Sequence, residues 1–167
     1  MPSEIGYLSH LIDLKLRGDG LYGTLPTELG LLEDLQYLRL YGTQINGSLP
    51  SEIGEMSSMR LIDIIWSDIS GTIPTEIGNL ENMVVFQIGI GGVSGSIPTE
   101  IGRMTRLKYF SLAQNEVQNL PTQFGLLDNL HWLYLYNNNI NSTIPTELSN
   151  AENLIVLDLS VSFVLIS

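Results

Sequence analysis

The chain has 167 residues, with 18 acidic residues against 7 basic ones, a formal net charge of −11 and no cysteine. This charge disfavours nonspecific contact with nucleic acid or with an anionic membrane surface, because both depend on cationic side chains. Disulfides and thiolate metal sites are excluded within this sequence, since it contains no cysteine.

The sequence is built from repeated units that each open with a proline. Five complete units span 24 residues and one spans 23. A constant period predicts stacked units that each bury their apolar side against their neighbours. Terminal units normally carry a polar cap, and neither end of this chain shows one. We therefore expect a single repeat domain over residues 1–167, without caps and excised from a longer array, with units 2–25, 26–49, 50–73, 74–97, 98–120, 121–144 and the incomplete 145–167.

Each unit is predicted to begin with a short arc, as in Pro74-Thr75-Glu76-Ile77-Gly78. The Thr or Ser after the proline, followed by Glu, predicts a helix start at which a hydroxyl and a carboxylate meet free backbone N–H groups. The glycine permits a turn or a close approach that a Cβ would hinder. In the second unit, the spacing of Leu29, Leu32 and Leu35 predicts a helical or 3-10 turn with one apolar side.

A strand is predicted after each arc. Leu38-Arg39-Leu40 alternates apolar and charged residues, which indicates a strand with one buried face. Ile45 and Leu49 complete the apolar positions of the second unit. Parallel strands of neighbouring units stack about 4.8 Å apart, so we expect equivalent outward side chains to form rows across one sheet.

The whole pattern is Leu-x-x-Leu-x-Leu, a polar position, Ile or Leu, and then Gly-x-Ile-Pro-x-Glu-Ile-Gly. It resembles the plant-type leucine-rich repeat, found in ectodomains of receptor-like kinases and in receptor-like proteins, and it also resembles repeats of algal and diatom surface proteins. The resemblance covers nearly the whole chain. It implies an α/β repeat fold, a right-handed leucine-rich repeat solenoid with a parallel β-sheet on the concave face and short 3-10, helical or irregular arcs on the convex face.

The family also carries an asparagine after the strand, whose side chain bonds backbone groups of the turn. The corresponding positions here are Asp19, Thr43, Ser67, Gly91, Asn115, Asn138 and Ser162. Asp, Thr and Ser can replace some of those bonds, whereas glycine cannot, and an unmet buried backbone group costs about 1–3 kcal/mol. We therefore expect the unit 74–97 to be the local weak point, and Gly91→Asn to raise thermal stability.

Four aromatic residues are predicted to face outward on the strands of the fifth and sixth units: Tyr109, Trp132, Tyr134 and Tyr136. The register places Tyr109 beside Trp132. Exposed aromatic side chains are typical anchors for protein partners, and their flat faces also suit sugar rings. The equally weighted alternative is that these rings only pack on one another as cross-strand pairs.

A second candidate surface lies on the first two strands and comprises Lys15, Arg17, Tyr37, Arg39 and Tyr41. Three of the seven basic residues gather there, so it could receive an acidic group of a ligand. The favoured alternative is a weak surface ion pair between Arg39 and Asp63, which share one position on successive strands.

The repeat frame offers no arrangement for catalysis. His10 and His131 occupy different positions in distant units, and the glycine run 89–95 is not followed by a helix as a phosphate-binding loop requires. We therefore predict no catalytic residue, no metal site and no cofactor. Asn46 and Asn141 begin acceptor sequons at one shared position of the unit, which makes both candidate glycosylation sites.

The leading hypothesis is a non-enzymatic module that binds a protein or peptide through its concave face, as part of a cell-surface or secreted recognition protein. The alternatives are a module for polysaccharide or cell-wall adhesion, and a structural spacer in a larger receptor-like kinase. We expect an extracellular or cell-surface location, with a cytoplasmic one as the alternative. Nucleic acid is not an expected partner, and the apolar run 161–166 is far shorter than the roughly 20 residues of a membrane span.

Overall fold

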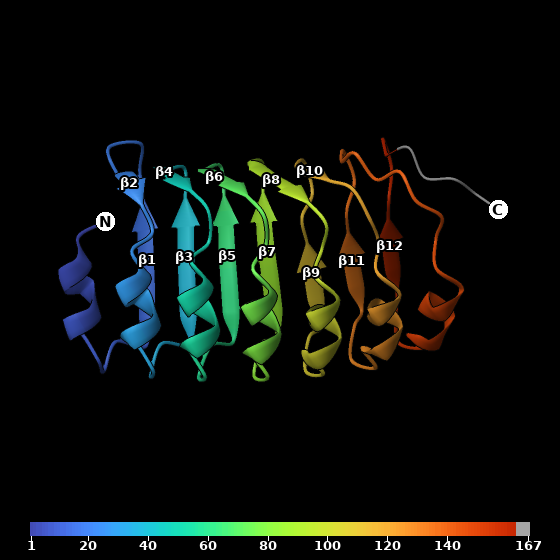
Figure 1. Ribbon diagram of the computed structural model, residues 1–167, viewed down its shortest axis with the longest axis horizontal. Helices are drawn as coiled ribbons and strands as arrows, with labels where there is room; N and C mark the ends of the chain where they lie inside the picture. The colour runs from blue at the N-terminus through green and yellow to red at the C-terminus, as the bar shows by residue number, and fades with distance from the viewer. Residues whose placement is uncertain (163–167) are drawn as a thin grey trace.

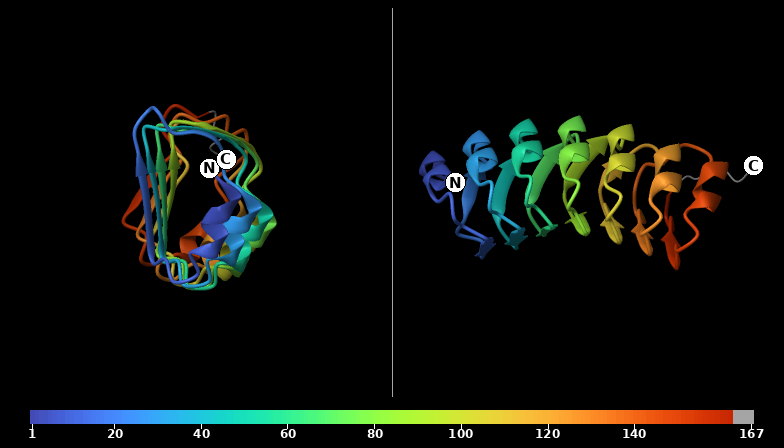
Figure 2. Two further views of the ribbon diagram at one scale, coloured as in Figure 1. Left: turned by 90° about the vertical axis from the view of Figure 1, so that its left-hand side faces the viewer. Right: turned by 90° about the horizontal axis from the view of Figure 1, so that it is seen from below.

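The computed structural model describes residues 1–162, so most of the apolar run 161–166 lies outside the described residues. It is an elongated stack of the repeated units (Figure 1), and the stack curves along its length (Figure 2, right). Seen along the stack, strands form one wall and short helices the opposite wall (Figure 2). Each unit contributes one five-residue 3-10 helix: η1 (Ser3–Tyr7), η2 (Thr27–Leu31), η3 (Ser51–Glu55), η4 (Thr75–Asn79), η5 (Thr99–Arg103), η6 (Thr122–Leu126) and η7 (Thr146–Asn150).

Two parallel sheets run along the stack. The larger, seven-stranded sheet has the order β1-β3-β5-β7-β9-β11-β12. Its strands are β1 (Asp13–Arg17), β3 (Tyr37–Tyr41), β5 (Leu61–Ile65), β7 (Val85–Gly89), β9 (Tyr109–Ser111), β11 (Trp132–Tyr134) and β12 (Val156–Asp158). The helices lie on the outer side of the curve (Figure 2). This arrangement confirms the predicted strand and arc in each unit.

The smaller, five-stranded sheet was not predicted. Its order is β10-β8-β6-β4-β2. The strands are β2 (Tyr22–Thr24), β4 (Gln44–Gly47), β6 (Asp68–Gly71), β8 (Gly92–Gly95) and β10 (Glu116–Val117). They follow the strands of the larger sheet after a turn, so the glycine run 89–95 spans the end of β7 and the whole of β8.

The apolar positions of the unit form one continuous core. In the second unit every predicted core position is at most 4% exposed. Three phenylalanines from neighbouring units form a row inside this core. The rings of Phe86 and Phe110 stack at 5.3 Å between centroids, and Phe110 meets Phe124 edge to face at 5.1 Å. This row adds aromatic packing to the burial of aliphatic side chains.

The glycine of the arc is required by the next unit. A Cβ on Gly30 would lie 2.7 Å from the carbonyl oxygen of Glu52, and one on Gly78 would lie 2.6 Å from the Cβ of Glu100. The predicted close approach is therefore confirmed, because any larger side chain would push neighbouring helices apart. Ser149 takes this position in the seventh unit, where no following helix packs within the described residues.

The predicted hydroxyl cap of the arc is wrong. The N-cap residue of each 3-10 helix is the proline, and no side chain bonds the first backbone N–H groups. The Ser or Thr lies inside the helix instead, where its hydroxyl donates to the carboxylate of the next residue; Thr75 donates to Glu76 over 3.1 Å. The helix starts one residue earlier than a cap would allow, which turns the hydroxyl away from the free N–H groups.

The asparagine positions join one unit to the preceding one. The side chain of Asn115 accepts from the N–H of Val93 over 3.0 Å and donates to the carbonyl of Ile88 over 2.8 Å. Asn138 serves Val117 and Leu112 in the same way, at 3.0 and 2.8 Å. The backbone of unit 74–97 is therefore hydrogen-bonded by Asn115, from the following unit. An asparagine at position 91 would instead bond the backbone of unit 50–73. The missing bonds are thus those of unit 50–73, and the expectation that unit 74–97 is the weak point is corrected.

The expected replacement of asparagine by shorter polar residues is wrong at two positions. The hydroxyl oxygens of Thr43 and Ser67 are buried and have no hydrogen-bond partner. Ser162 does bond the preceding unit, through the carbonyl of Leu135 at 3.2 Å. A hydroxyl is shorter than a carboxamide and offers one donor, so it does not reach both backbone groups that an asparagine bonds.

We predict that Gly91→Asn lowers the free energy of unfolding by about 1–3 kcal/mol, because overpacking is destabilising. A Cβ at this position would lie only 2.9 Å from the carbonyl oxygen of Ile69. The matched variant is Ser67→Asn, at the same position of the preceding unit. It should raise stability by about 0.5–1.5 kcal/mol, the worth of a hydrogen bond. Chemical denaturation measures both; a more stable Gly91→Asn protein would reinstate the original expectation.

Candidate functional site

The outward side chains of the larger sheet form rows, as the period predicts. One row runs through Lys15, Arg39, Asp63, Gln87, Ser111, Tyr134 and Asp158, which are paired strand by strand. Along this row the chemistry changes from charged on β1, β3 and β5 to uncharged on β7, β9 and β11. The concave face therefore has a charged end at β1, β3 and β5 and an uncharged, aromatic part on β7, β9 and β11, beyond which Asp158 on β12 is charged again.

The aromatic candidates lie together. Tyr109 is directly opposite Trp132, as the register predicts, with 6.5 Å between ring centroids. Tyr109 also meets Tyr134 at 5.5 Å, and His131 meets Trp132 at 5.3 Å. Trp132 remains 36% exposed. The rings pack as cross-strand pairs and still present surface, so both interpretations of this cluster have a structural basis.

A hollow of about 400 Å³ opens beside these rings on the concave face. It is lined by Ile65, Trp66, Gln87, Gly89, Ile90, Tyr109, Ser111, Ala113, Gln114, Tyr134 and Tyr136, and Trp132 lies outside it. No acidic or basic side chain lines the hollow. Burial raises the pKa of the Tyr109 hydroxyl above its usual value of 10.0, so this group, uncharged near neutral pH like any tyrosine, stays uncharged to higher pH. The lining therefore suits an uncharged group with some capacity for hydrogen bonding.

The rim of the hollow contains strained backbone. One equivalent position in each unit, shortly after the strand of the larger sheet, has a positive φ of 54° to 118°. The residues at this position are Gly18, Gly42, Trp66, Ile90, Gln114, Asn137 and Val161. Glycine and asparagine adopt this conformation readily, whereas bulky and β-branched residues do so at a cost. Trp66 and Ile90 are 62% and 39% exposed. The strain thus holds two large apolar side chains at the edge of the hollow.

Sequence reasoning missed Ile90 and Gln114 as lining residues. They directly follow the alternating positions of the strand, at a position expected to face outward, but they were not singled out as part of a site. The available signal was the glycine or asparagine at the same position in other units, namely Gly18, Gly42 and Asn137.

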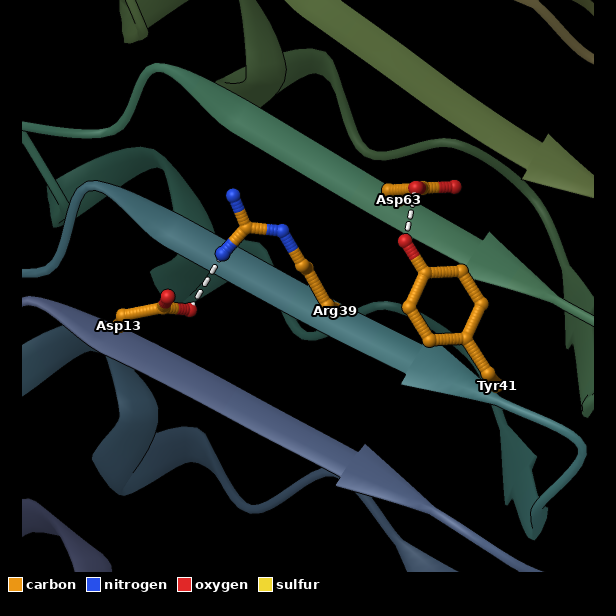
Figure 3. A network of polar contacts seen from close by, with 4 residues as sticks. All are labelled: Asp13, Arg39, Tyr41 and Asp63. Carbon is orange, nitrogen blue, oxygen red and sulfur yellow. Dashed lines mark hydrogen bonds and ion pairs between the residues drawn. The ribbon is translucent and has the colours of Figure 1, made fainter.

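The charged end of the face is organised by Arg39 (Figure 3). Its guanidinium lies 2.5 Å from a carboxylate oxygen of Asp13 and 4.8 Å from the centre of the Tyr37 ring. The predicted Arg39–Asp63 pair is therefore wrong. Arg39 pairs with Asp13 across the sheet instead, and Asp63 accepts a hydrogen bond from Tyr41. Lys15 and Arg17 are exposed and form no ion pair within the described residues.

Asp63 is only partly satisfied. Its Oδ2 accepts from the Tyr41 hydroxyl, while its Oδ1 is buried and has no hydrogen-bond donor. Burial, followed by the hydrogen bond and the negative charge of Asp63, raises the pKa of Tyr41 to about 12. The pair thus keeps a protonated tyrosine beside a carboxylate on the open face.

The other sequence-based candidates are placed as follows. Asn46, in β4, and Asn141 are both exposed, so their side chains are accessible. Within residues 1–162, no three His, Cys, Asp or Glu side chains are grouped to hold a metal ion. No helix of that part of the chain is long and apolar enough to cross a membrane.

Comparison with known families gives one match, to the Leucine Rich Repeat, at residues 34–56 and 129–151. No curated protein matches significantly in sequence. Among solved structures, the plant peptide hormone receptor RGFR1 in complex with RGF2 aligns with 98% of this chain, at 32% identity and a TM-score of 0.95. The chain spans only 26% of that receptor's length.

Two further structures show the range of the likeness. A chain of the BIR3–SERK2 complex from Arabidopsis thaliana is 30% identical over 78% of this chain and 69% of its own length, with a TM-score of 0.69. An LRR protein of Leptospira interrogans is 31% identical over 96% of this chain and 40% of its own, with a TM-score of 0.81. The likeness therefore extends beyond plant receptors.

We predict that Ile90→Asn raises the free energy of unfolding by about 1 kcal/mol, because asparagine accepts a positive φ that isoleucine resists. The reciprocal change Asn137→Ile, at the same position two units later, should lower it by a similar amount. Thermal or chemical denaturation measures both effects. Loss of stability in Ile90→Asn would mean that the apolar contacts of Ile90 outweigh its backbone strain.

We predict a pH effect from the Tyr41–Asp63 pair. Because the folded pKa of Tyr41 is raised from 10.0 to about 12, its contribution to stability is fully present below pH 10 and is lost as the pH rises through about 12. Tyrosinate absorbance of the wild type minus that of Tyr41→Phe isolates this ionisation. Asp63→Asn should move the step toward lower pH, and an unchanged step would contradict the assigned cause.

Proposed function

Since the chain belongs to the leucine-rich repeat proteins, with repeats of the plant type, we propose that it is a non-enzymatic module that binds a protein or peptide along its concave face. The hollow beside Tyr109 and Tyr134 is the observation that carries this proposal. It lies on the concave face, where outward side chains differ from unit to unit while the strands keep one parallel register. Rigid aromatic side chains around a hollow are favourable anchors for a partner, since little conformational entropy is lost on binding.

The strained residues of the rim support the same site. Trp66 and Ile90 hold a costly backbone conformation although glycine serves at the equivalent position of the first two units. Such strain concentrates at functional sites. Both side chains project at the edge of the hollow, where they would cover part of a bound segment.

The comparisons support a peptide or protein as the partner class. RGFR1 is described as a plant peptide hormone receptor, and the BIR3–SERK2 structure is a complex of proteins. An extended peptide suits a row of strands, because its length can run across several units. We extend the proposal to an extracellular or cell-surface location. The exposed asparagines of the two sequons, Asn46 and Asn141, support it.

A second candidate is binding of a polysaccharide, favoured by one observation. Trp132 lies outside the hollow and keeps 36% of its surface exposed, so its ring could stack on a sugar. In this case a soluble neutral polysaccharide such as xyloglucan would bind the chain, and Trp132→Ala would abolish that binding while Trp66→Ala would leave it intact. A chain that binds neither peptide nor polysaccharide would instead fit the spacer hypothesis.

The test of the leading proposal is selection of a random peptide library, displayed on phage, against the purified chain. Selected peptides are synthesised and their dissociation constants measured. Trp66→Ala should weaken binding at least roughly tenfold, the loss of about 1.4 kcal/mol, since it removes one wall of the hollow. Tyr22→Ala is the matched control, because Tyr22 is exposed on the smaller sheet. Absence of any specific peptide, or equal loss in both variants, would overturn the proposal.

A further inference from the structure

The concave face contains one carboxylate that the folded chain leaves incomplete. The Oδ2 of Asp63 accepts from Tyr41, but its Oδ1 is buried without a donor. A buried charged oxygen without a hydrogen bond is unfavourable. A ligand that supplies the missing donor would therefore gain more than one that contacts an exposed, hydrated carboxylate.

No cation of the described chain forms an ion pair with Asp63. Arg39 is its neighbour in the sheet, yet Figure 3 shows the guanidinium directed to Asp13, 2.5 Å away. Lys15 and Arg17 lie on β1, two strands from β5, at a separation of roughly 10 Å. Salt screens charges over about that distance. The Asp63 carboxylate thus has no ion-pair partner in the folded chain and can accept a cation from a ligand.

The position of Asp63 relates it to the hollow. It is paired with Gln87 on β7, and Gln87 lines the hollow. One strand spacing, about 4.8 Å, separates the two residues. Alternate residues of an extended peptide lie roughly 6–7 Å apart. A peptide crossing the strands can therefore present one residue to the hollow and another, one to three positions away, to Asp63.

We propose that Asp63 receives a cationic nitrogen of a bound peptide, from Lys, Arg or a free amino terminus, while a neighbouring uncharged side chain fills the hollow. This inference rests on the proposed peptide-binding function and specifies which side chains a bound peptide carries. Because Oδ1 is shielded from solvent, a side chain beside it must rotate as the ligand enters. Arg39, Tyr41 and Gln87 surround this position in the sheet and are only half-buried, so they can move.

A cationic donor fits better than a neutral one. A hydrogen bond to an ionised acceptor is roughly twice as strong as a neutral one, and a cationic donor adds the Coulomb attraction between the two opposite charges. The net charge of −11 also attracts cationic ligands during encounter. A polysaccharide hydroxyl or a backbone amide could reach the same oxygen, but neither neutralises the carboxylate.

The test uses a peptide obtained from the library selection and a second copy in which its basic residue is replaced by Gln. On the wild-type chain, this replacement should weaken binding roughly ten- to hundredfold, as expected for a charged hydrogen bond. On Asp63→Asn, the two peptides should bind with similar dissociation constants. Fluorescence anisotropy measures all four values, and circular dichroism confirms that the variant is folded.

The matched control is Asp68→Asn, which removes the same charge from an exposed position on the smaller sheet. It separates a specific contact from the general attraction of basic peptides to an acidic protein, so it should preserve the difference between the two peptides. Asp13→Asn provides a second readout. It frees Arg39 to turn toward Asp63 and should weaken binding of the basic peptide by competing for the carboxylate.

The outcomes separate this inference from the proposed function. Selected peptides that require Trp66 but carry no basic residue near the hollow residue would overturn the role of Asp63 and leave peptide binding standing. Equal discrimination by wild type and Asp63→Asn would do the same. Failure to select any specific peptide would overturn both, and binding of the neutral polysaccharide alone would assign the face to a polysaccharide.

Discussion

The parallel hydrogen-bond ladder of the larger sheet is the constraint on which the rest of the structure depends. Each strand bonds the strand of the unit before it and the unit after it, so every unit must repeat at the strand spacing. The arcs meet that spacing only because glycine lets one 3-10 helix lie against the next, as at Gly30 and Gly78. Once the backbone is fixed in this way, outward side chains fall into rows, and any of them can change without altering the stack.

Much of this architecture could be predicted from the sequence, because the core positions repeat. Leu38 and Leu40 alternate with Arg39, which identifies a strand and its buried face. The smaller sheet could not be predicted in this way, since β4 contains one apolar residue, Ile45, and shows no alternation. The arc cap failed for a different reason: the composition suited a cap, but the helix begins one residue earlier, and its geometry is not encoded in the residue types alone.

In the candidate site, too, some contacts were predictable from the sequence and others were not. The contact of Tyr109 with Trp132 followed from register, because both occupy one row of the sheet. The ion-pair partner of Arg39 did not follow from register, because Asp13 and Asp63 lie on the strands to either side. The choice between them depends on the conformation of the arginine side chain over the Tyr37 ring. The hollow also depends on Trp66 and Ile90, whose direction comes from a backbone conformation outside the alternating pattern. Regular backbone is therefore predictable from period, whereas individual side-chain contacts are decided by local geometry.

The asparagine side chains make some junctions between units stronger than others. Asn115 and Asn138 fasten the fourth, fifth and sixth units to one another through buried carboxamides, while Thr43, Ser67 and Gly91 supply no such fastening to the first three. In a stack where each unit touches only its neighbours, the loosest junction opens first. Under tension or partial denaturation the amino-terminal units would separate first. The hollow lies across this boundary, because Ile65 and Trp66 belong to the third unit while Tyr109 and Tyr134 belong to the fifth and sixth, so separation of the amino-terminal units would remove its Trp66 side.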